Sequence, residues 1–300
     1  MKRIMKQILF TGLIAIVITA SAQAELNVAA TIPNLGMLAR EIGGSAVNVR
    51  VMAPADRDAH YLEARPSMMA ALRRADIVIS VGSELEIGWL PAAIRGANNP
   101  RVQTGRTGYF EATRKVDLIQ EDYPADRSMG DVHPAGNPHI YLDPERMVTV
   151  GHALAERLGR LDRDNADRFK QNAKAFEEKI MERLPAWKER AEGAPAVLPY
   201  HSDADYLIGW LNLENLGQIE PLPGIPPTAR HLRSLVSEYE GREGIIWAMD
   251  FHPSDPNQYM SRQLGWAFHQ LPNSVPENGT VDDYIKMIDA WVESLVDTDG

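Results

Sequence analysis

The sequence contains no cysteine among its 300 residues. It therefore offers no disulfide framework and no cysteine that could carry a lipid anchor. It also lacks the His-Glu-x-x-His motif of many zinc peptidases and the Gly-x-Ser-x-Gly motif of many serine hydrolases. Beyond the first 24 residues, no segment is long and apolar enough to predict a membrane span. These absences argue against a disulfide-rich domain, two common hydrolase classes and an integral membrane protein.

The N-terminal residues have the pattern of an export signal. Lys2, Arg3 and Lys6 precede an apolar stretch at residues 8–20 and small residues at 22–24. This order is typical of a secretory signal peptide cleaved after residue 24, and a retained membrane anchor is the alternative. We expect a soluble, exported protein of the bacterial periplasm that is not lipid-anchored. The formal net charge of −10 argues against nucleic acid as a partner.

Strand and helix patterns alternate in the first half of the chain. Apolar strands are expected at 26–30, 47–52 and 76–81, and helices at 34–42 and 66–74. Such alternation predicts an α/β lobe with a parallel sheet and helices on both faces. Residues 105–137 have poor periodicity and are expected to form a long surface loop.

The middle of the chain predicts long helices. Residues 145–158 and 163–190 are rich in Ala, Glu, Lys, Arg and Leu, with apolar residues near helical spacing. The second of these helices would be about 42 Å long, the length of a whole domain. We interpret it as a rigid connector, with an ordinary surface helix of one larger domain as the alternative.

The last third of the chain resumes the alternation. Strands are expected at 196–200, 216–220, 244–250 and 267–271, and helices at 204–211, 228–239, 256–264 and 281–295. The predicted organisation is an N-terminal α/β lobe at 25–160, a linking helix at 161–192 and a C-terminal α/β lobe at 193–300. Two such lobes in series favour a ligand in the crevice between them.

Four short segments carry side chains suited to a metal ion. His60 and His201 each follow a predicted strand, where α/β folds place ligands, and His139 follows Pro138 in a loop. Asp282 opens the last predicted helix, where an aspartate is often only an N-cap. Three imidazoles and one carboxylate are a sufficient donor set for tetrahedral zinc. Donors this far apart in sequence can meet only in a folded cleft.

The context of these residues resembles a known family, the periplasmic metal-binding receptors of zinc and manganese ABC importers, also called the cluster A-I or zinc-uptake-receptor-like family. The resemblance covers essentially the whole chain after residue 24. It rests on these segments: Ala-His-Tyr-Leu-Glu-Ala-Arg-Pro-Ser at 59–67, Gly-Asn-Pro-His-Ile-Tyr-Leu-Asp-Pro at 136–144, Tyr-His-Ser at 200–202, Glu-Pro-Leu-Pro-Gly-Ile-Pro-Pro-Thr at 220–228 and Asp-Asp-Tyr at 282–284.

The resemblance implies two α/β lobes joined by a long backbone helix, with one metal ion in the cleft between them. It implies His60, His139, His201 and Asp282 as ligands, with the adjacent Asp283 as the alternative carboxylate. Histidine rather than glutamate at position 201 favours Zn(II), because imidazole suits zinc. Zinc affinity is then expected to fall below about pH 6, as protons compete for the imidazoles.

The implied function is that of a receptor, not an enzyme. The expected partners are an ABC permease in the membrane, its ATPase and a periplasmic zinc chaperone, and the receptor itself is expected to be a monomer. A manganese or iron receptor of the same family, a secreted zinc-dependent hydrolase and a surface adhesin are the alternatives.

A few further residues are candidates for supporting roles. His133, in the predicted loop with Asp122, Asp126 and Asp131, is interpreted as part of a solvated acidic segment or as a metal-capturing group. His252 follows a predicted strand and is a candidate for the rim of the site. Asp143 and Tyr200 are candidates for orienting the ligands beside them. The remaining histidines, His152, His231 and His269, suit surface or packing roles.

Overall fold

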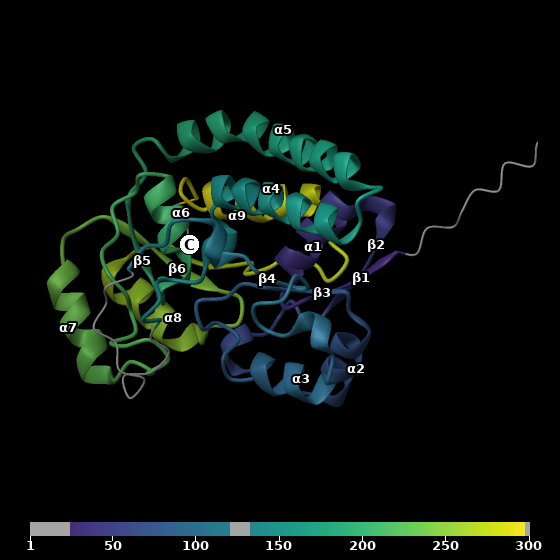
Figure 1. Cartoon of the computed structure of the whole chain (residues 1–300). Coiled ribbons are helices and arrows are strands. Elements are labelled where there is room, and N and C mark those ends of the chain that lie inside the picture. Colours follow the sequence, from purple (N-terminus) through teal and green to yellow (C-terminus); the bar gives the residue numbers. More distant parts are fainter. Residues whose placement is uncertain (1–24, 121–132, 298–300) are drawn as a thin grey trace, which may run out of the picture.

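The computed structural model describes residues 25–120 and 133–297 (Figure 1). The predicted signal peptide and residues 121–132 of the predicted loop lie outside this part of the chain. Two parallel sheets form the framework, one in each half of the sequence. The α/β fold with two parallel sheets is therefore confirmed.

The first sheet has the strand order β2-β1-β3-β4 and is parallel throughout. Its strands are β1 (Leu26–Ala30), β2 (Val47–Val51), β3 (Ile77–Ser80) and β4 (Tyr109–Glu111). Three helices surround it: α1 (Pro33–Gly43), α2 (Pro66–Arg74) and α3 (Leu90–Ala97). Each of these helices has a proline in its first turn, where the missing N–H would have no partner. Alternate strand residues face opposite layers, so Val28 packs toward α1 and Ala29 toward α2 and α3.

The second sheet has the order β5-β6-β7 and is also parallel. Its strands are β5 (Ala196–Pro199), β6 (Gly244–Met249) and β7 (Phe268–Leu271). The accompanying helices are α6 (Asp205–Trp210), α7 (Ala229–Tyr239), α8 (Ser254–Leu264) and α9 (Val281–Glu293). Trp247 of β6 packs edge-to-face on Trp291 of α9, with ring centroids 5.1 Å apart. The opposite face of this sheet packs against α7 and α8.

Two helices run along one side of both sheets. They are α4 (Pro144–Leu161) and α5 (Ala166–Ala191), and Figure 1 shows α5 outermost. The 26 residues of α5 span about 39 Å. Its apolar face contacts α1 of the first half, α4, and α9 of the last segment. Ile79 of the first sheet, Phe176 of α5 and Trp247 of the second sheet belong to one continuous buried cluster.

A few predicted elements differ from the structure. Helix α3 was not predicted, and the three-residue strand β4 lies within the segment expected to be a loop, paired to β3 through Val78 and Tyr109. Residues 216–220 run beside β5, with backbone N–H groups of Leu216 and Ile219 donating to Val197 and Pro199. They do not form the predicted regular strand, because Gly217, with a φ of +108°, interrupts the ladder. Among the described residues, no helix combines the length and apolar character needed to cross a membrane.

Candidate metal centre

The three predicted histidine ligands meet between the two sheets. His60 lies in the 3₁₀ turn Ala59–Tyr61, which comes after β2. His139 directly precedes the 3₁₀ turn Ile140–Leu142, and His201 follows β5. Ring centroids are 5.2 Å apart for His60 and His139, 5.7 Å for His139 and His201, and 6.4 Å for His60 and His201. The carboxyl ends of the parallel strands thus bring together residues 141 positions apart, as α/β folds do for ligands.

Two further side chains complete the cluster. His133 places its Nε2 only 3.0 Å from Nε2 of His60. Asp203, two residues after His201, places Oδ1 3.2 Å from Nε2 of His139. The donor atoms form two triads that share His139: one with His60 and His133, the other with His201 and Asp203. Within each triad all donor atoms lie within 4.8 Å of one another.

Backbone and side-chain acceptors fix the orientation of the imidazoles. Nδ1 of His60 lies 2.6 Å from a carboxylate oxygen of Asp58. Nδ1 of His139 lies 2.9 Å from Oδ1 of Asn137, an oxygen that also accepts the backbone N–H of His139. Because these partners only accept, each Nδ1 carries the proton when the ring is neutral, and the Nε2 lone pair points into the cluster.

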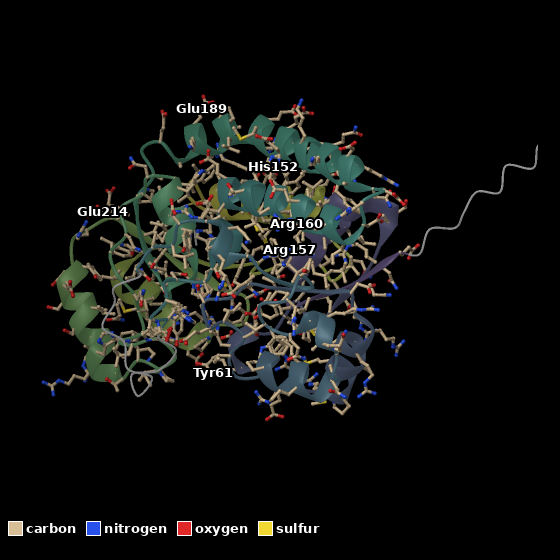
Figure 2. All side chains as sticks on the ribbon, in the orientation of Figure 1. Tyr61, His152, Arg157, Arg160, Glu189 and Glu214 are labelled. Carbon is tan, nitrogen blue, oxygen red and sulfur yellow. The ribbon has the colours of Figure 1, made fainter. Side chains whose placement is uncertain are left out.

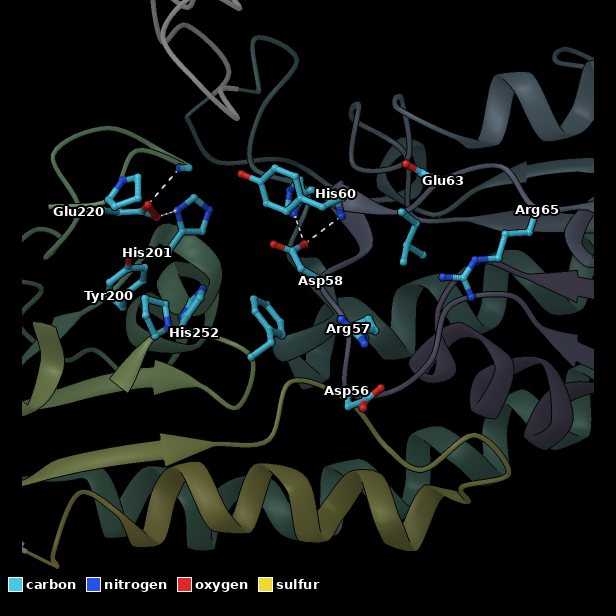
Figure 3. A pocket seen from close by; sticks show the side chains of 16 residues that line it. Asp56, Arg57, Asp58, His60, Glu63, Arg65, Tyr200, His201, Glu220 and His252 are labelled. Atoms are coloured by element: carbon cyan, nitrogen blue, oxygen red, sulfur yellow. Dashed lines mark hydrogen bonds and ion pairs between the residues drawn. The ribbon is translucent and has the colours of Figure 1, made fainter. Parts of the chain in front are cut away.

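The same rule holds for the other two imidazoles. Nδ1 of His133 lies 3.1 Å from the carbonyl oxygen of Ser83, and Nδ1 of His201 lies 2.6 Å from Oε1 of Glu220 (Figure 3). When the rings are neutral, His60, His133 and His139 direct Nε2 lone pairs into one donor triad, and His201 directs one into the triad that it forms with His139 and Asp203. This is the arrangement that histidine ligands adopt when an acceptor holds the second ring nitrogen.

Burial and neighbouring charges separate the pKa values of these groups. Burial and the surrounding histidines lower the pKa of His139 well below its ordinary range and lower that of His133 to about 3. Burial also acts to lower the pKa of His201, but the carboxylates of Asp203 and Glu220 outweigh it and raise the value to about 9. Burial raises the pKa of Asp203 to about 6. At neutral pH the rings of His133 and His139 are therefore neutral, whereas the ring of His201 is doubly protonated and positively charged.

A proton or a metal ion shared between the rings would satisfy the facing nitrogen atoms. With both Nδ1 atoms protonated, the Nε2 atoms of His60 and His133 are two acceptors 3.0 Å apart. Nε2 of His139 faces a carboxylate oxygen of Asp203 in the same way and, among the described residues, has no hydrogen-bond partner. Two nitrogens bound to one tetrahedral zinc at about 2.05 Å lie about 3.3 Å apart. The observed separation is close to that value, so the residues present fit a metal ion.

Asp282 is not part of this cluster, which corrects the prediction from the sequence. Its side chain is 71% exposed on α9, and the nearest cation is Nζ of Lys179 at 3.8 Å. Asp283, the alternative, forms a capping box with Thr280 at the start of α9. The local sequence matches the pattern expected of the ligand segment, but both carboxylates serve the helix N-terminus and the surface. Asp203 supplies the carboxylate among the histidines instead.

The predicted orienting residues have other roles. Asp143 accepts the backbone N–H of Arg146 as the N-cap of α4 and pairs with the Arg146 side chain. Tyr200 contacts His252 in a tilted arrangement, with ring centroids 4.6 Å apart. The residues that hold the imidazoles are Asp58, Ser83, Asn137 and Glu220. Their signal in the sequence is partial: Asp58 and Asn137 each precede a histidine by two residues, whereas Ser83 and Glu220 are distant in the chain.

The other predicted histidine positions are also located. His252 lies beside the cluster, with Nε2 3.3 Å from Oδ2 of Asp203. His152 is exposed on α4, where it pairs with Glu177 of α5 (Figure 2). His231 contacts the carbonyl oxygen of Ile219, and His269 that of Asp297. These last three therefore have the surface or packing roles expected of them.

The cluster opens on one side to a cavity of about 700 Å³. His60, His201 and His252 line its inner wall, and Arg57 and Arg65 lie on the wall formed by the loop that carries His60 (Figure 3). His139, by contrast, is fully buried behind them. An ion could therefore enter from this side and reach an interior donor set.

Comparison with known proteins identifies relatives of this arrangement. The manganese ABC transporter substrate-binding lipoprotein scaA of Streptococcus gordonii is 26% identical over 180 residues, which cover 59% of this chain and 55% of that protein. The zinc-binding lipoprotein AdcA of Streptococcus pneumoniae (strain ATCC BAA-255 / R6) is 23% identical over 232 residues, which cover 75% of this chain and 45% of that protein. The chain therefore spans about half the length of these curated relatives.

The fold comparison agrees with the sequence comparison. The structure of FpvC from Pseudomonas aeruginosa in complex with Mn²⁺ superposes with a TM-score of 0.76 at 21% identity, covering 91% of this chain and 98% of that one. The family model described as zinc-uptake complex component A, periplasmic, matches residues 28–298. That family consists of substrate-binding transport proteins, not enzymes. The resemblance found in the sequence is thus confirmed, and the chain belongs to the zinc-uptake complex component A family.

Proposed function

We propose that the chain is an exported periplasmic receptor that captures one divalent transition-metal ion, Zn(II) first, and delivers it to an ABC permease driven by its ATPase. In this proposal the ion is held between the lobes by Nε2 atoms of His60, His133, His139 and His201. Family membership supports the transport role, and the names of the relatives, which include zinc and manganese, support a metal cargo.

The observation that carries this proposal is the 3.0 Å separation of the Nε2 atoms of His60 and His133. Each ring is held by an acceptor at Nδ1, Asp58 in one case and the Ser83 carbonyl in the other. Two lone pairs at this distance repel unless a proton or a metal ion lies between them. A divalent metal ion satisfies both nitrogens at once, whereas an apolar or anionic cargo satisfies neither.

The donor chemistry favours zinc over manganese. Imidazole nitrogens dominate the cluster, and they suit zinc, copper, iron and nickel, while manganese prefers carboxylate, carbonyl and water oxygens. Manganese is the second candidate, because scaA is named as a manganese transporter component and FpvC was solved with Mn²⁺. A zinc hydrolase is not retained, because the family is one of transport proteins.

Release of the ion would proceed through loop movement. The donors come from both halves of the chain: His60, His133 and His139 precede α4, and His201 follows β5. Helix α5 braces both halves through α1 and α9 and resists a wide hinge opening. We propose that the permease separates the ligand loops rather than rotating whole lobes.

The test is a metal titration of the mature protein. After metal removal, Zn(II) and Mn(II) are titrated against a chelator of known affinity, with His139→Ala as the site variant and His152→Ala as the matched control. The expected result is one tight zinc equivalent, lost in His139→Ala and retained in His152→Ala, because His152 is exposed on α4. Tighter manganese binding would assign the second candidate. No stoichiometric binding of either ion would refute the receptor proposal.

A further inference from the structure

A buried carboxylate lies between two histidines at the centre of the cluster. Asp203, in the 3₁₀ turn Ser202–Ala204, has a side chain only 4% exposed. Its Oδ1 lies 3.2 Å from Nε2 of His139, and its Oδ2 lies 3.3 Å from Nε2 of His252. Among the described residues, Nε2 of His139 and Oδ2 of Asp203 have no aligned hydrogen-bond partner. Such atoms are costly to bury unless something satisfies them.

The two histidines differ in tautomer. Nδ1 of His139 faces Oδ1 of Asn137 and carries the proton, so its Nε2 presents a lone pair to Asp203. Nδ1 of His252 instead accepts the backbone N–H of Met249 at 3.1 Å. The proton of a neutral His252 is therefore on Nε2, which lies 3.3 Å from Oδ2 of Asp203. His139 is suited to bind a metal beside Asp203, and His252 is suited to hold the carboxylate.

The other carboxylates of the cluster are already engaged. Asp58 contacts Nδ1 of His60 at 2.6 Å, and Glu220 contacts Nδ1 of His201 at 2.6 Å. Asp282, expected from the sequence to supply the anion, is 71% exposed on α9. Asp203 is thus the carboxylate with an oxygen facing a ligand Nε2, and it belongs to one of the two metal-compatible triads.

We propose that Asp203 is the anionic ligand of the bound ion and that His252 is the positioning residue that directs its carboxylate. This inference rests on the proposed receptor function. It gives the ion one carboxylate beside His139 and His201, the two histidines of the same triad.

The first test compares Asp203→Asn with Asp282→Asn, a matched pair that removes one charge each. Both are loaded with Zn(II) in the presence of a competing chelator. Asp203→Asn is expected to weaken zinc binding by about a hundredfold or more, and Asp282→Asn by less than about twofold. The Asn side chain matches Asp in size, and burial already favours the neutral form of Asp203, so Asp203→Asn is expected to fold; circular dichroism and a thermal melt verify this.

The second test reads the coordination directly. Co(II) absorbs visible light more strongly when it is four-coordinate than when it is five- or six-coordinate. Loss of the carboxylate in Asp203→Asn is expected to change the band intensity and position, while Asp282→Asn retains the wild-type spectrum. If wild type binds one metal ion and Asp203→Asn has the same affinity and spectrum, the inference fails and the receptor function stands. If wild type binds no metal, the receptor function itself fails.

The role of His252 is tested by a pair of variants. His252→Leu removes the N–H donor, and His252→Gln keeps one at similar reach. His252→Leu is expected to lose about tenfold in zinc affinity and to shift the Co(II) spectrum, with His252→Gln closer to wild type. In an Asp203→Asn background, His252→Leu is expected to add little, because its effect passes through the carboxylate. Full additivity of the two substitutions would show that His252 does not act through Asp203.

Discussion

Metal binding is expected to expel one proton from His201 near neutral pH. This imidazole lies 2.6 Å from Glu220 and belongs to the same triad as Asp203. The two carboxylates outweigh burial and raise its pKa to about 9. The experiment varies the pH between 7 and 9.5. The variant Glu220→Gln removes one of the two carboxylates that raise the pKa of His201.

The magnitude follows from the pKa. With a value of about 9 for His201, about 97% of the molecules carry the proton at pH 7.5 and about half at pH 9. Zinc must displace it to reach Nε2, so affinity should fall about tenfold for each pH unit below 9. Below pH 6 the proton on Asp203, whose pKa is about 6, makes the dependence steeper. The onset therefore lies well above the pH of about 6 expected from unperturbed imidazoles.

The stability of the metal-free protein changes with pH in the opposite direction to its zinc affinity. Folding raises the pKa of His201 from 6.5 to about 9, so its proton stabilises the fold fully below pH 6.5. That contribution is lost as the pH rises through 9. Metal-free protein should become less stable over this window, while the zinc-bound protein should not follow that loss.

Calorimetric titration in two buffers with different ionisation enthalpies gives the proton count. We expect about one proton released per zinc at pH 7.5 and fewer in Glu220→Gln. A flat zinc affinity from pH 7 to 9 with no proton release would refute the reasoning, because it would mean that His201 is already neutral. Equal release in Glu220→Gln would assign the effect to another group.

Three further substitutions test how the fold supports the site. Asp143→Ala removes the N-cap that accepts the backbone N–H of Arg146, and should cost about 1–2 kcal/mol of unfolding free energy with zinc affinity unchanged within about twofold. Phe176→Ala opens a cavity beneath α5 and should cost about 3–5 kcal/mol in urea unfolding. Gly43→Ala places a Cβ against both Cγ atoms of Val47 and should cost about 1–3 kcal/mol by overpacking, measured by the same urea unfolding.

A specific result would contradict each of these three expectations. Loss of zinc affinity in a folded Asp143→Ala variant would restore Asp143 as an orienting residue. An unchanged urea midpoint for Phe176→Ala would mean that α5 is not required for the core. A neutral Gly43→Ala would mean that the chain after α1 shifts without cost. Arg160→Ala, on the exposed face of α4, serves as a control with an expected effect within about 0.5 kcal/mol.

Much of the fold could be predicted from periodicity. Strand β1 and helix α2 have the boundaries expected from the sequence, and most other elements differ by one to three residues. The failures have local causes. Strand β4 is three residues long, too short to show alternation, and its pairing with β3 is decided by tertiary contact. The strand expected at 216–220 fails at Gly217, whose left-handed backbone interrupts pairing.

Only some residues of the candidate site could be predicted from the sequence. His60 and His201 could be predicted to lie close together because parallel strands place their carboxyl ends at one edge of the sheet. Asp203 was missed because nothing in the spacing of His-Ser-Asp shows that a 3₁₀ turn will direct both side chains inward. Asp282 was misassigned because a motif in sequence does not decide whether a helix N-terminus faces the cleft. Burial and side-chain direction emerge only when the lobes pack together.

The buried cluster that joins Ile79, Phe176 and Trp247 has a consequence for how the molecule loses its structure. A chain whose two sheets share one buried cluster should melt in a single cooperative transition instead of one half at a time. An ion held by donors from both halves would then raise the melting temperature of the entire chain in proportion to the logarithm of its free concentration. The melting temperature of the whole chain, measured at several free metal concentrations, would thus report the affinity of the cleft for the ion.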